Sequence, residues 1–439
     1  MTSADQQRSA TSGAGAAAAV EEYAASELPA SERHSTLSIT LVRMGYTVSA
    51  TDLLFGMSLG LYFSFWTALY VALLSSIAIC AVSILVGLIG QREGLTTALI
   101  TRMTFGREGS RIPSLVIAAI SVGFVGYSTA ITADVLPGGQ GYWLLYIIAL
   151  SIVYTVLSSV GFAKGLTWVG RISVPLMIIA VLVAVIAAIN HAGGWSQIIN
   201  GHPAQPDKLS IVTMIALGTA KWMQGATVSP DITRFARNAG AVYTTTIAEF
   251  LVGNLGFNLL GIILGLAVGT GNMGEAFTTI GVGALATIAI FVQGFPHEVN
   301  NLYAGSLAGR NALDVPRLYV NLASGVLAAA LAYYGLTQGL LQSFLRYLGY
   351  LAYAMPLIPG IMIADYFFIR RGRYSHQVAA AEAVNWRAVA AFVIGLAVNL
   401  YLGLFAKDAL WHTLPVIGFV LYLLFSWRQM AAAWSKPAS

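Results

Sequence analysis

Three ionisable residues stand near the middle of long apolar runs of the sequence: Asp52, Lys221 and Glu298. A charge at that depth of a bilayer is costly and usually marks a functional site. His297 precedes Glu298, and a histidine titrates near neutrality in water. These residues could bind a polar solute or carry a proton. An Asp52–Lys221 ion pair is sterically feasible, and it could either be purely structural or belong to such a site.

The composition explains why these charges matter. The 439 residues are 57% hydrophobic and 9% charged, with a mean hydropathy of +0.75, whereas soluble domains carry roughly 25% charged residues. Apolar runs of about 20 residues, enough for one helical span, recur along nearly the whole chain. The alternating segments of a membrane barrel are absent, so the spans are helical. We therefore expect an all-α polytopic membrane protein in contact with the lipid bilayer.

The sequence also argues against several other classes of protein. The formal charge of +5 is distributed between the spans, so nucleic acid is not an expected partner. The one cysteine, Cys80, allows neither an intrachain disulfide nor a multi-cysteine zinc site. We expect no cofactor and no metal centre, and the sequence leaves the oligomeric state open.

Twelve transmembrane spans are predicted, with approximate bounds 37–61, 64–90, 113–136, 141–162, 169–190, 209–229, 241–269, 277–301, 316–335, 341–369, 386–405 and 411–427. Arginines gather in every second connection, from Arg92 to Arg111 and again from Arg370 to Arg387. By the positive-inside rule these connections are cytoplasmic, so both termini are predicted to be cytoplasmic. We expect the protein to lie in the cytoplasmic (inner) membrane. Residues 1–36 are predicted to form a disordered cytoplasmic tail, and residues 430–439 a second cytoplasmic tail.

Two of the spans are rich in glycine and polar residues at their centres. The first contains Gly45, Thr47, Ser49, Thr51, Asp52 and Gly56, and the sixth contains Gly218, Lys221, Gln224, Gly225 and Pro230. Secondary transporters often bind substrate where two discontinuous helices, one from each inverted repeat, unwind near the midplane. The spacing favours a five-plus-five inverted repeat over residues 37–374, followed by two additional helices over 375–429. Glycine used only for close helix packing is the alternative.

Several motifs resemble those of the nucleobase:cation symporter family of purine and cytosine permeases. They are GLTT at 94–97 with Arg102, Phe105 and Gly106; Asp231, Arg234, Phe235, Arg237 and Asn238; the segment from Asn300 to Leu307; and the segment from Ile363 to Tyr366. The cytosine permease branch is the most similar, over about residues 39–374. The resemblance implies a secondary transporter that imports a small nitrogen heterocycle such as cytosine, a purine or a hydantoin.

The resemblance also implies a substrate site. Its positions fall on Ser121, Phe124, Lys221, Trp222, Gln293 and Glu298, so two aromatic rings are kept whereas the hydrogen-bonding edge differs. Ser121, Phe124 and Ser128 share one face of the third span, and Phe124 and Trp222 could instead be packing residues. Ser49, Asp52, Gln224 and Gly225 at the two interruptions complete the predicted site. A Glu298 carboxylate could accept two ring N–H groups.

Sodium-coupled members of this fold hold the ion with carbonyls of the first span, here Gly45 and Val48, and with hydroxyls that fall on Pro296 and His297. Neither replacement suits a hard cation, so we expect proton symport through Asp52, Lys221, His297 or Glu298. Sodium coupling, or a uniporter in which Lys221 replaces the ion, are the alternatives. A channel or an intramembrane enzyme is a remote alternative, because neither a selectivity filter nor an H-E-x-x-H motif is present.

Overall fold

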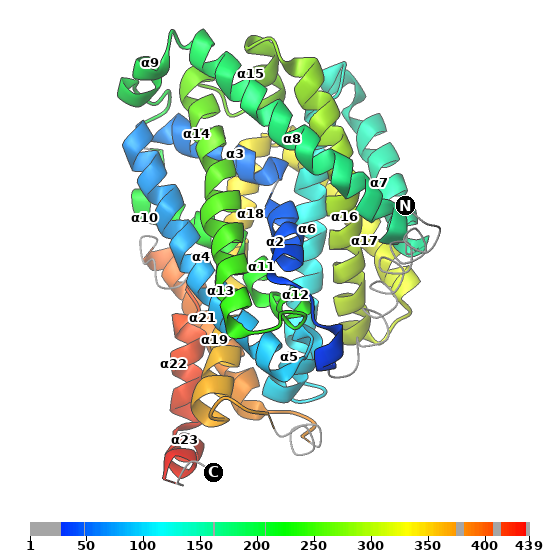
Figure 1. Ribbon diagram of the computed structural model, residues 1–439, viewed down its shortest axis with the longest axis vertical. Helices are drawn as coiled ribbons and strands as arrows, with labels where there is room; N and C mark the ends of the chain where they lie inside the picture. The colour runs from blue at the N-terminus through cyan, green and yellow to red at the C-terminus, as the bar shows by residue number, and fades with distance from the viewer. Residues whose placement is uncertain are drawn as a thin grey trace, which may run out of the picture.

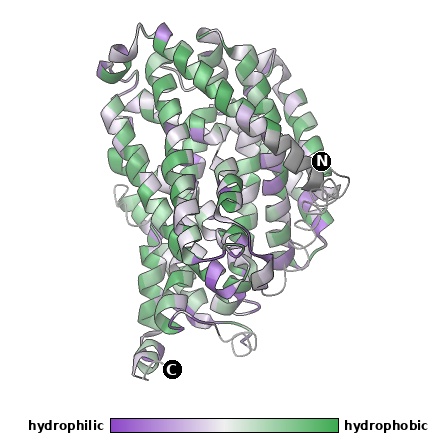
Figure 2. Cartoon of the chain, viewed as in Figure 1, coloured by the Kyte–Doolittle hydropathy of each residue, from purple (hydrophilic) through white to green (hydrophobic). Residues whose placement is uncertain are grey.

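The computed structural model describes residues 28–47, 49–160, 163–206, 208–374, 382–406 and 414–435. These residues form a bundle of helices, with no β-strand among them (Figure 1). Hydrophobic residues follow the helices, whereas hydrophilic residues gather around α5 and α12 at one end of the bundle (Figure 2). The expectation of an all-α polytopic membrane protein is confirmed.

Each predicted span falls on one helix or on consecutive helices. The first six correspond to α2 (Thr36–Thr47) with α3 (Ala50–Tyr62), α4 (Phe65–Glu93), α6 (Arg111–Val135), α7 (Trp143–Val160), α8 (Ala163–His191), and α10 (Ile211–Lys221) with α11 (Met223–Thr227). The others correspond to α13 (Ala239–Ile247) with the π-helix η3 (Ala248–Asn254) and α14 (Leu255–Val268), α16 (Gly283–Leu313), α17 (Arg317–Thr337), α18 (Leu340–Ala354) with α19 (Leu357–Ile363) and the π-helix η4 (Ala364–Ile369), α21 (Trp386–Phe405), and α22 (Val416–Phe425).

Short helices connect these spans. They are η1 (Ala30–Glu32), α5 (Thr97–Phe105), η2 (Gly139–Tyr142), α9 (Trp195–Asn200), α12 (Pro230–Thr233), α15 (Met273–Thr279) and α23 (Trp427–Trp434). Within the described residues, seven helical segments are long and apolar enough to cross a membrane on those two criteria alone, or eight if the bent pair α22–α23 is counted as one span. The remaining spans are interrupted, only partly described, or carry polar residues, as α16 does at His297, Glu298 and Arg310.

The first and sixth spans are interrupted as predicted. α2 ends at Thr47, Ser49 is extended (φ −134°, ψ 147°), and α3 begins at Ala50. In the sixth span, Trp222 leaves helical geometry (φ −106°, ψ 7°) between α10 and α11. Ser49 caps α3, because its hydroxyl accepts from the Asp52 N–H at 3.2 Å. The interruptions therefore place Asp52 in the first turn of α3 and Lys221 in the last turn of α10.

Glycines bring α3 and α14 into backbone contact. A Cβ added at Gly56 would meet the backbone of Asn258, and one at Gly261 would meet the backbone of Leu53 and Gly56. Such close approach is how membrane helices gain packing energy without a hydrophobic driving force. Both interpretations of the first span therefore apply, at different positions: the helix is interrupted before Ala50, and Gly56 allows close helix packing. This contact fixes α14 beside the start of α3.

One motif that carries the family resemblance joins two connections. Asp231 in α12 accepts from the backbone N–H of Thr97, the first residue of α5, at 2.8 Å. A carboxylate is favourable at a helix N-terminus because the free N–H groups point at it. Burial raises the pKa of Asp231, and the bond from the Thr97 N–H acts in the opposite direction. The motif thus links the end of the sixth span to the connection after the second.

The predicted disordered tail is wrong in its last part. Residues 1–27 lie outside the described residues, but Leu28 is buried and its N–H donates to the Gly94 carbonyl at 3.0 Å. The His34 N–H donates to the Phe235 carbonyl at 2.8 Å, and the two rings stack. Composition could not show that this segment finds backbone partners and an apolar contact in distant connections. The second predicted tail, 430–439, begins within α23, which ends at Trp434 and is bent by 75° from α22; its cytoplasmic position remains a prediction.

Candidate functional site

A buried ion pair joins the two interrupted spans. Lys221 Nζ lies 2.5 Å from Asp52 Oδ1, and neither side chain is more than 2% exposed. The second carboxylate oxygen, Oδ2, accepts from the Ser49 hydroxyl at 2.7 Å. The predicted Asp52–Lys221 contact is therefore present, and both oxygens of Asp52 are occupied by protein groups.

Trp222 shares the same carboxylate. Its indole Nε1–H donates to Asp52 Oδ1 at 2.8 Å, and its ring packs edge-to-face against Phe250, with ring centroids 5.9 Å apart. A Cβ added at Gly225 would come within 2.6 Å of the Trp222 ring, so a side chain at this position would clash with the indole. Ser49, Asp52, Lys221, Trp222 and Gly225 thus form one cluster at the two interruptions.

Lys221 has further partners in α3 and α14. Its ammonium donates to Asn258 Oδ1 at 2.9 Å and lies 4.6 Å from the centroid of the Phe55 ring. Asn258 donates to Asn254, which in turn donates to Ser76 on α4. Our sequence reasoning missed the two asparagines, although an i, i+4 pair of amides inside an apolar span was a signal that could have identified them.

The predicted face of α6 lies against α11 and α16. Ser121 and Ser128 are buried, and Phe124 is half-buried. Gln224 Nε2 donates to the Ser121 hydroxyl at 2.7 Å, which joins two of the predicted site residues. Phe124 packs edge-to-face with Tyr347 of α18 at 5.5 Å. The nearest aromatic partners recorded for Phe124 and Trp222 are thus Tyr347 and Phe250, and a sandwich of one ligand between Phe124 and Trp222 remains a prediction.

α16 contributes the other predicted residues. Gln293 and Glu298 are buried, and His297 Nε2 lies 3.9 Å from Glu298 Oε1. Within the part of the chain that the structure describes, neither Glu298 oxygen has a hydrogen-bond partner. The side chains of Ser128 and Asn301 lie beside the carboxyl and could donate to it after a small rotation, and His297 lies within electrostatic reach of Asp52. This group, His297 with Glu298 and Ser128, is named the α16 seam below.

The two predicted carbonyl ligands of the first span lie next to its interruption in the sequence. Gly45 belongs to the last turn of α2, and Val48 lies outside the described residues. No group of three or more potential metal ligands of the His, Cys, Asp or Glu type occurs among the residues described. The arrangement therefore offers two things. One is an aromatic ring held by a hydrogen bond at the interruptions, and the other is a buried carboxyl at the α16 seam that has no hydrogen-bond partner among the described residues and lies 3.9 Å from His297.

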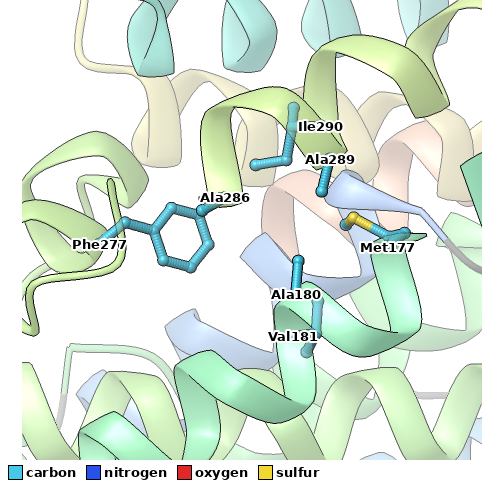
Figure 3. Close-up of a pocket in the computed structure, with 7 residues that line it drawn as sticks. All are labelled: Met177, Ala180, Val181, Phe277, Ala286, Ala289 and Ile290. Carbon is cyan, nitrogen blue, oxygen red and sulfur yellow. The ribbon is translucent and has the colours of Figure 1, made fainter. Parts of the chain in front are cut away.

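A separate cavity lies between α8, α15 and α16 (Figure 3). It is lined by apolar residues alone: Met177, Ala180, Val181, Phe277, Ala286, Ala289 and Ile290. A polar heterocycle needs hydrogen-bond partners when it leaves water. This cavity offers no such side chain, so it is not the candidate site.

A second buried ion pair ties α2 to η3. Arg43 Nε donates to Glu249 Oε2 at 2.8 Å, and its Nη2 also contacts that oxygen. Arg43 also donates to Ser229 at 2.8 Å and to Ser83 at 2.9 Å. The partner of Glu249 lies inside the first span, because α2 packs along η3 and brings Arg43 to that depth.

The family that this chain matches and the known proteins that it resembles agree with each other. Residues 27–425 match the family described as permeases for cytosine/purines, uracil, thiamine and allantoin. The cytosine permease of Escherichia coli (strain K12) is 27% identical over 377 residues, which is 85% of this chain and 88% of the relative.

Two solved structures share the fold. One is Mhp1, a nucleobase-cation-symport-1 family transporter, in a closed conformation with bromovinylhydantoin bound; it has a TM-score of 0.75 at 18% identity over 93% of this chain and 95% of that chain. The other is a Na+-coupled sialic acid symporter, with a TM-score of 0.66 at 14% identity over 92% of this chain and 90% of that chain.

Proposed function

Because the chain belongs to the family of permeases for cytosine/purines, uracil, thiamine and allantoin, we propose that it imports a nucleobase-like nitrogen heterocycle together with a proton. It is a multi-pass membrane permease and not an enzyme. We assign the transport core to residues 37–374 and a peripheral position to the two following helices. Both termini are cytoplasmic in this proposal, and the membrane is the inner membrane.

The substrate assignment is supported by the clusters at the interruptions and on α6. Trp222 provides a flat aromatic face, and Phe124 on α6 provides a second one for a ring that enters between them. Ser121, Gln224 and Gln293 offer hydroxyl and amide groups for the polar edge of the ring. Hydantoin and cytosine, named for the relatives, are the first compounds to test.

The α16 seam is the observation that carries the proton assignment. Pro296 offers no side-chain ligand for sodium, and the His297 imidazole is a poorer ligand for a hard cation than a hydroxyl is. His297 and the unpartnered Glu298 carboxyl can each take up and release a proton. Sodium coupling in a protein of the same fold, the sialic acid symporter, makes sodium the competing candidate.

Uptake into proteoliposomes tests the proposal. Purified protein is reconstituted and offered cytosine, uracil, hypoxanthine, allantoin and hydantoin under an inward proton gradient or an inward sodium gradient, with protein-free liposomes as the control. We expect saturable accumulation of at least one ring under the proton gradient alone. Accumulation driven by sodium and indifferent to pH would refute the proton assignment. No saturable uptake of any ring would refute the substrate class.

Labelling of single cysteines introduced into the connections tests the orientation. A cysteine in the 136–141 connection is expected to react with a membrane-impermeant reagent in intact cells, whereas one in the Arg370–Arg373 connection reacts only after permeabilisation. The Cys80→Ser background provides the unlabelled reference. The reverse pattern would invert the proposed topology.

A further inference from the structure

We infer that Asp52 and Lys221 are positioning residues that hold the Trp222 ring in place and do not themselves contact the transported ring. The inference rests on the proposed function, which gives Trp222 the role of an aromatic face for the substrate. It also narrows the sequence prediction, which placed Asp52 and Lys221 both in the substrate site and in cation coupling.

The hydrogen bonds of the pair support this assignment. Asp52 Oδ1 receives both the Lys221 ammonium and the Trp222 indole N–H, and Oδ2 receives the Ser49 hydroxyl. Lys221 is also bonded to Asn258 of α14. The donors to Asp52 fill three of the roughly four lone-pair positions of the carboxylate, and the Phe55 ring lies beside the Lys221 ammonium. Both charges are therefore engaged chiefly by protein groups, which leaves little of either for a substrate ring.

The position of Trp222 explains why it needs such a restraint. It lies at the backbone interruption, directly after Lys221, and outside helical geometry. The indole has a single donor, and that donor is directed at Asp52. A hydrogen bond to an ionised acceptor is stronger than one between neutral groups. The Lys221 ammonium provides the countercharge that a buried carboxylate requires.

The recorded hydrogen bonds of the pair lead away from α6 and α16, although Asp52 lies within electrostatic reach of His297. The recorded partners of Lys221 belong to α3 and α14, whereas the proposed ring-contacting residues Ser121, Phe124 and Gln293 belong to α6 and α16. Trp222 therefore has two sides: its N–H edge is bound to Asp52, whereas its half-buried ring packs against Phe250 and away from that carboxylate.

A set of matched variants tests the inference in the full-length protein. Lys221→Gln combined with Asp52→Asn removes both charges but keeps an oxygen acceptor for the indole. Lys221→Gln combined with Asp52→Leu has nearly the same shape without the acceptor. Each pair is made with Trp222 and with Trp222→Phe. Binding is measured in nanodiscs with whichever of cytosine, uracil, hypoxanthine and allantoin the unmodified protein binds most tightly.

We expect the Asn pair to bind the heterocycle within about threefold of the unmodified protein. The Leu pair should bind it about tenfold more weakly, because the hydrogen bond that holds the Trp222 indole is lost. Trp222→Phe alone should weaken binding by a similar factor. Adding Trp222→Phe to the Leu pair should not weaken binding further, because both changes remove the same hydrogen bond. Equal binding by all these variants would overturn the inference while leaving the transport proposal intact.

The Asn pair provides a second way to refute the inference. If it folds but loses binding as completely as the Leu pair, the charges themselves contact the ligand or the coupling ion. The emission of Trp222, taken as the difference between each protein and its Trp222→Phe version, reports the ring's surroundings without any ligand. We expect this emission to shift in the Leu pair and not in the Asn pair. Were the unmodified protein to bind none of the rings, the transport proposal and this inference would both fail.

Discussion

Buried charged side chains have different surroundings in two regions of this permease. In the bundle formed by the interrupted spans, Asp52 is paired with Lys221, and Arg43 is paired with Glu249. At the α16 seam, within the described residues, the Glu298 oxygens have no hydrogen-bond partner, and His297 lies 3.9 Å away. Buried polar groups in native proteins are nearly always paired, so a buried carboxyl with both oxygens unbonded is informative.

This difference suggests a structural role for the paired charges and a role in transport for the α16 seam. Removing one member of a buried ion pair leaves the other uncompensated, so paired charges hold the helices that carry them in one arrangement. A buried carboxyl that makes no hydrogen bond within the described residues, as at Glu298, is available to a ligand or a proton. We therefore assign the paired residues to holding α2, α3 and Trp222 in place, and we assign coupling to the α16 seam.

The largest expected effect concerns the Arg43–Glu249 pair. Arg43→Met leaves a buried carboxylate without its partner and should lower stability by about 3–5 kcal/mol. Thermal or denaturant unfolding in detergent micelles would measure it. The double variant Arg43→Met/Glu249→Leu removes both charges and should recover most of the loss. If Arg43→Met unfolds at the same point as the unmodified protein, this pair does not hold α2 in place.

The next effect concerns the aromatic face. Trp222→Ala removes one stacking surface, and the loss of a stacked base costs roughly 1–3 kcal/mol in other proteins, so binding of the transported ring should weaken about tenfold or more. Trp195→Ala, at the start of the connecting helix α9, is the matched control and should bind as the unmodified protein does. Equilibrium binding in nanodiscs provides the measurement. Unchanged affinity in Trp222→Ala would show that the site is elsewhere.

A smaller effect is expected where α6 meets α11. Ser121→Ala removes the acceptor for Gln224, a hydrogen bond worth about 0.5–1.5 kcal/mol. Gln224 is only half-buried and can turn to another partner, which limits the loss. Ligand affinity should fall less than in Trp222→Ala, and the unfolding midpoint should change little. A loss larger than that of Trp222→Ala would make Ser121 a principal substrate contact.

The sequence was sufficient for the architecture and for the Asp52–Lys221 contact. Apolar runs marked the spans, and polar and glycine residues marked the two interruptions, because both signals are local in the chain. The sequence could not show that Asp52 also holds the Trp222 indole, since that contact depends on the rotation of α3 against α10. Nor could it pair Arg43 with Glu249, because 206 residues separate them and the depth of α2 against η3 decides the contact.

The assignment of coupling to the α16 seam can be tested most directly with Glu298→Gln in proteoliposomes. An amide fills the same space but carries no titratable proton. We predict that this variant still exchanges labelled for unlabelled ring across the membrane but no longer accumulates it under an inward proton gradient. Glu275→Gln, an exposed carboxylate on α15, should behave as the unmodified protein does. Accumulation by Glu298→Gln that still follows the proton gradient would contradict the account.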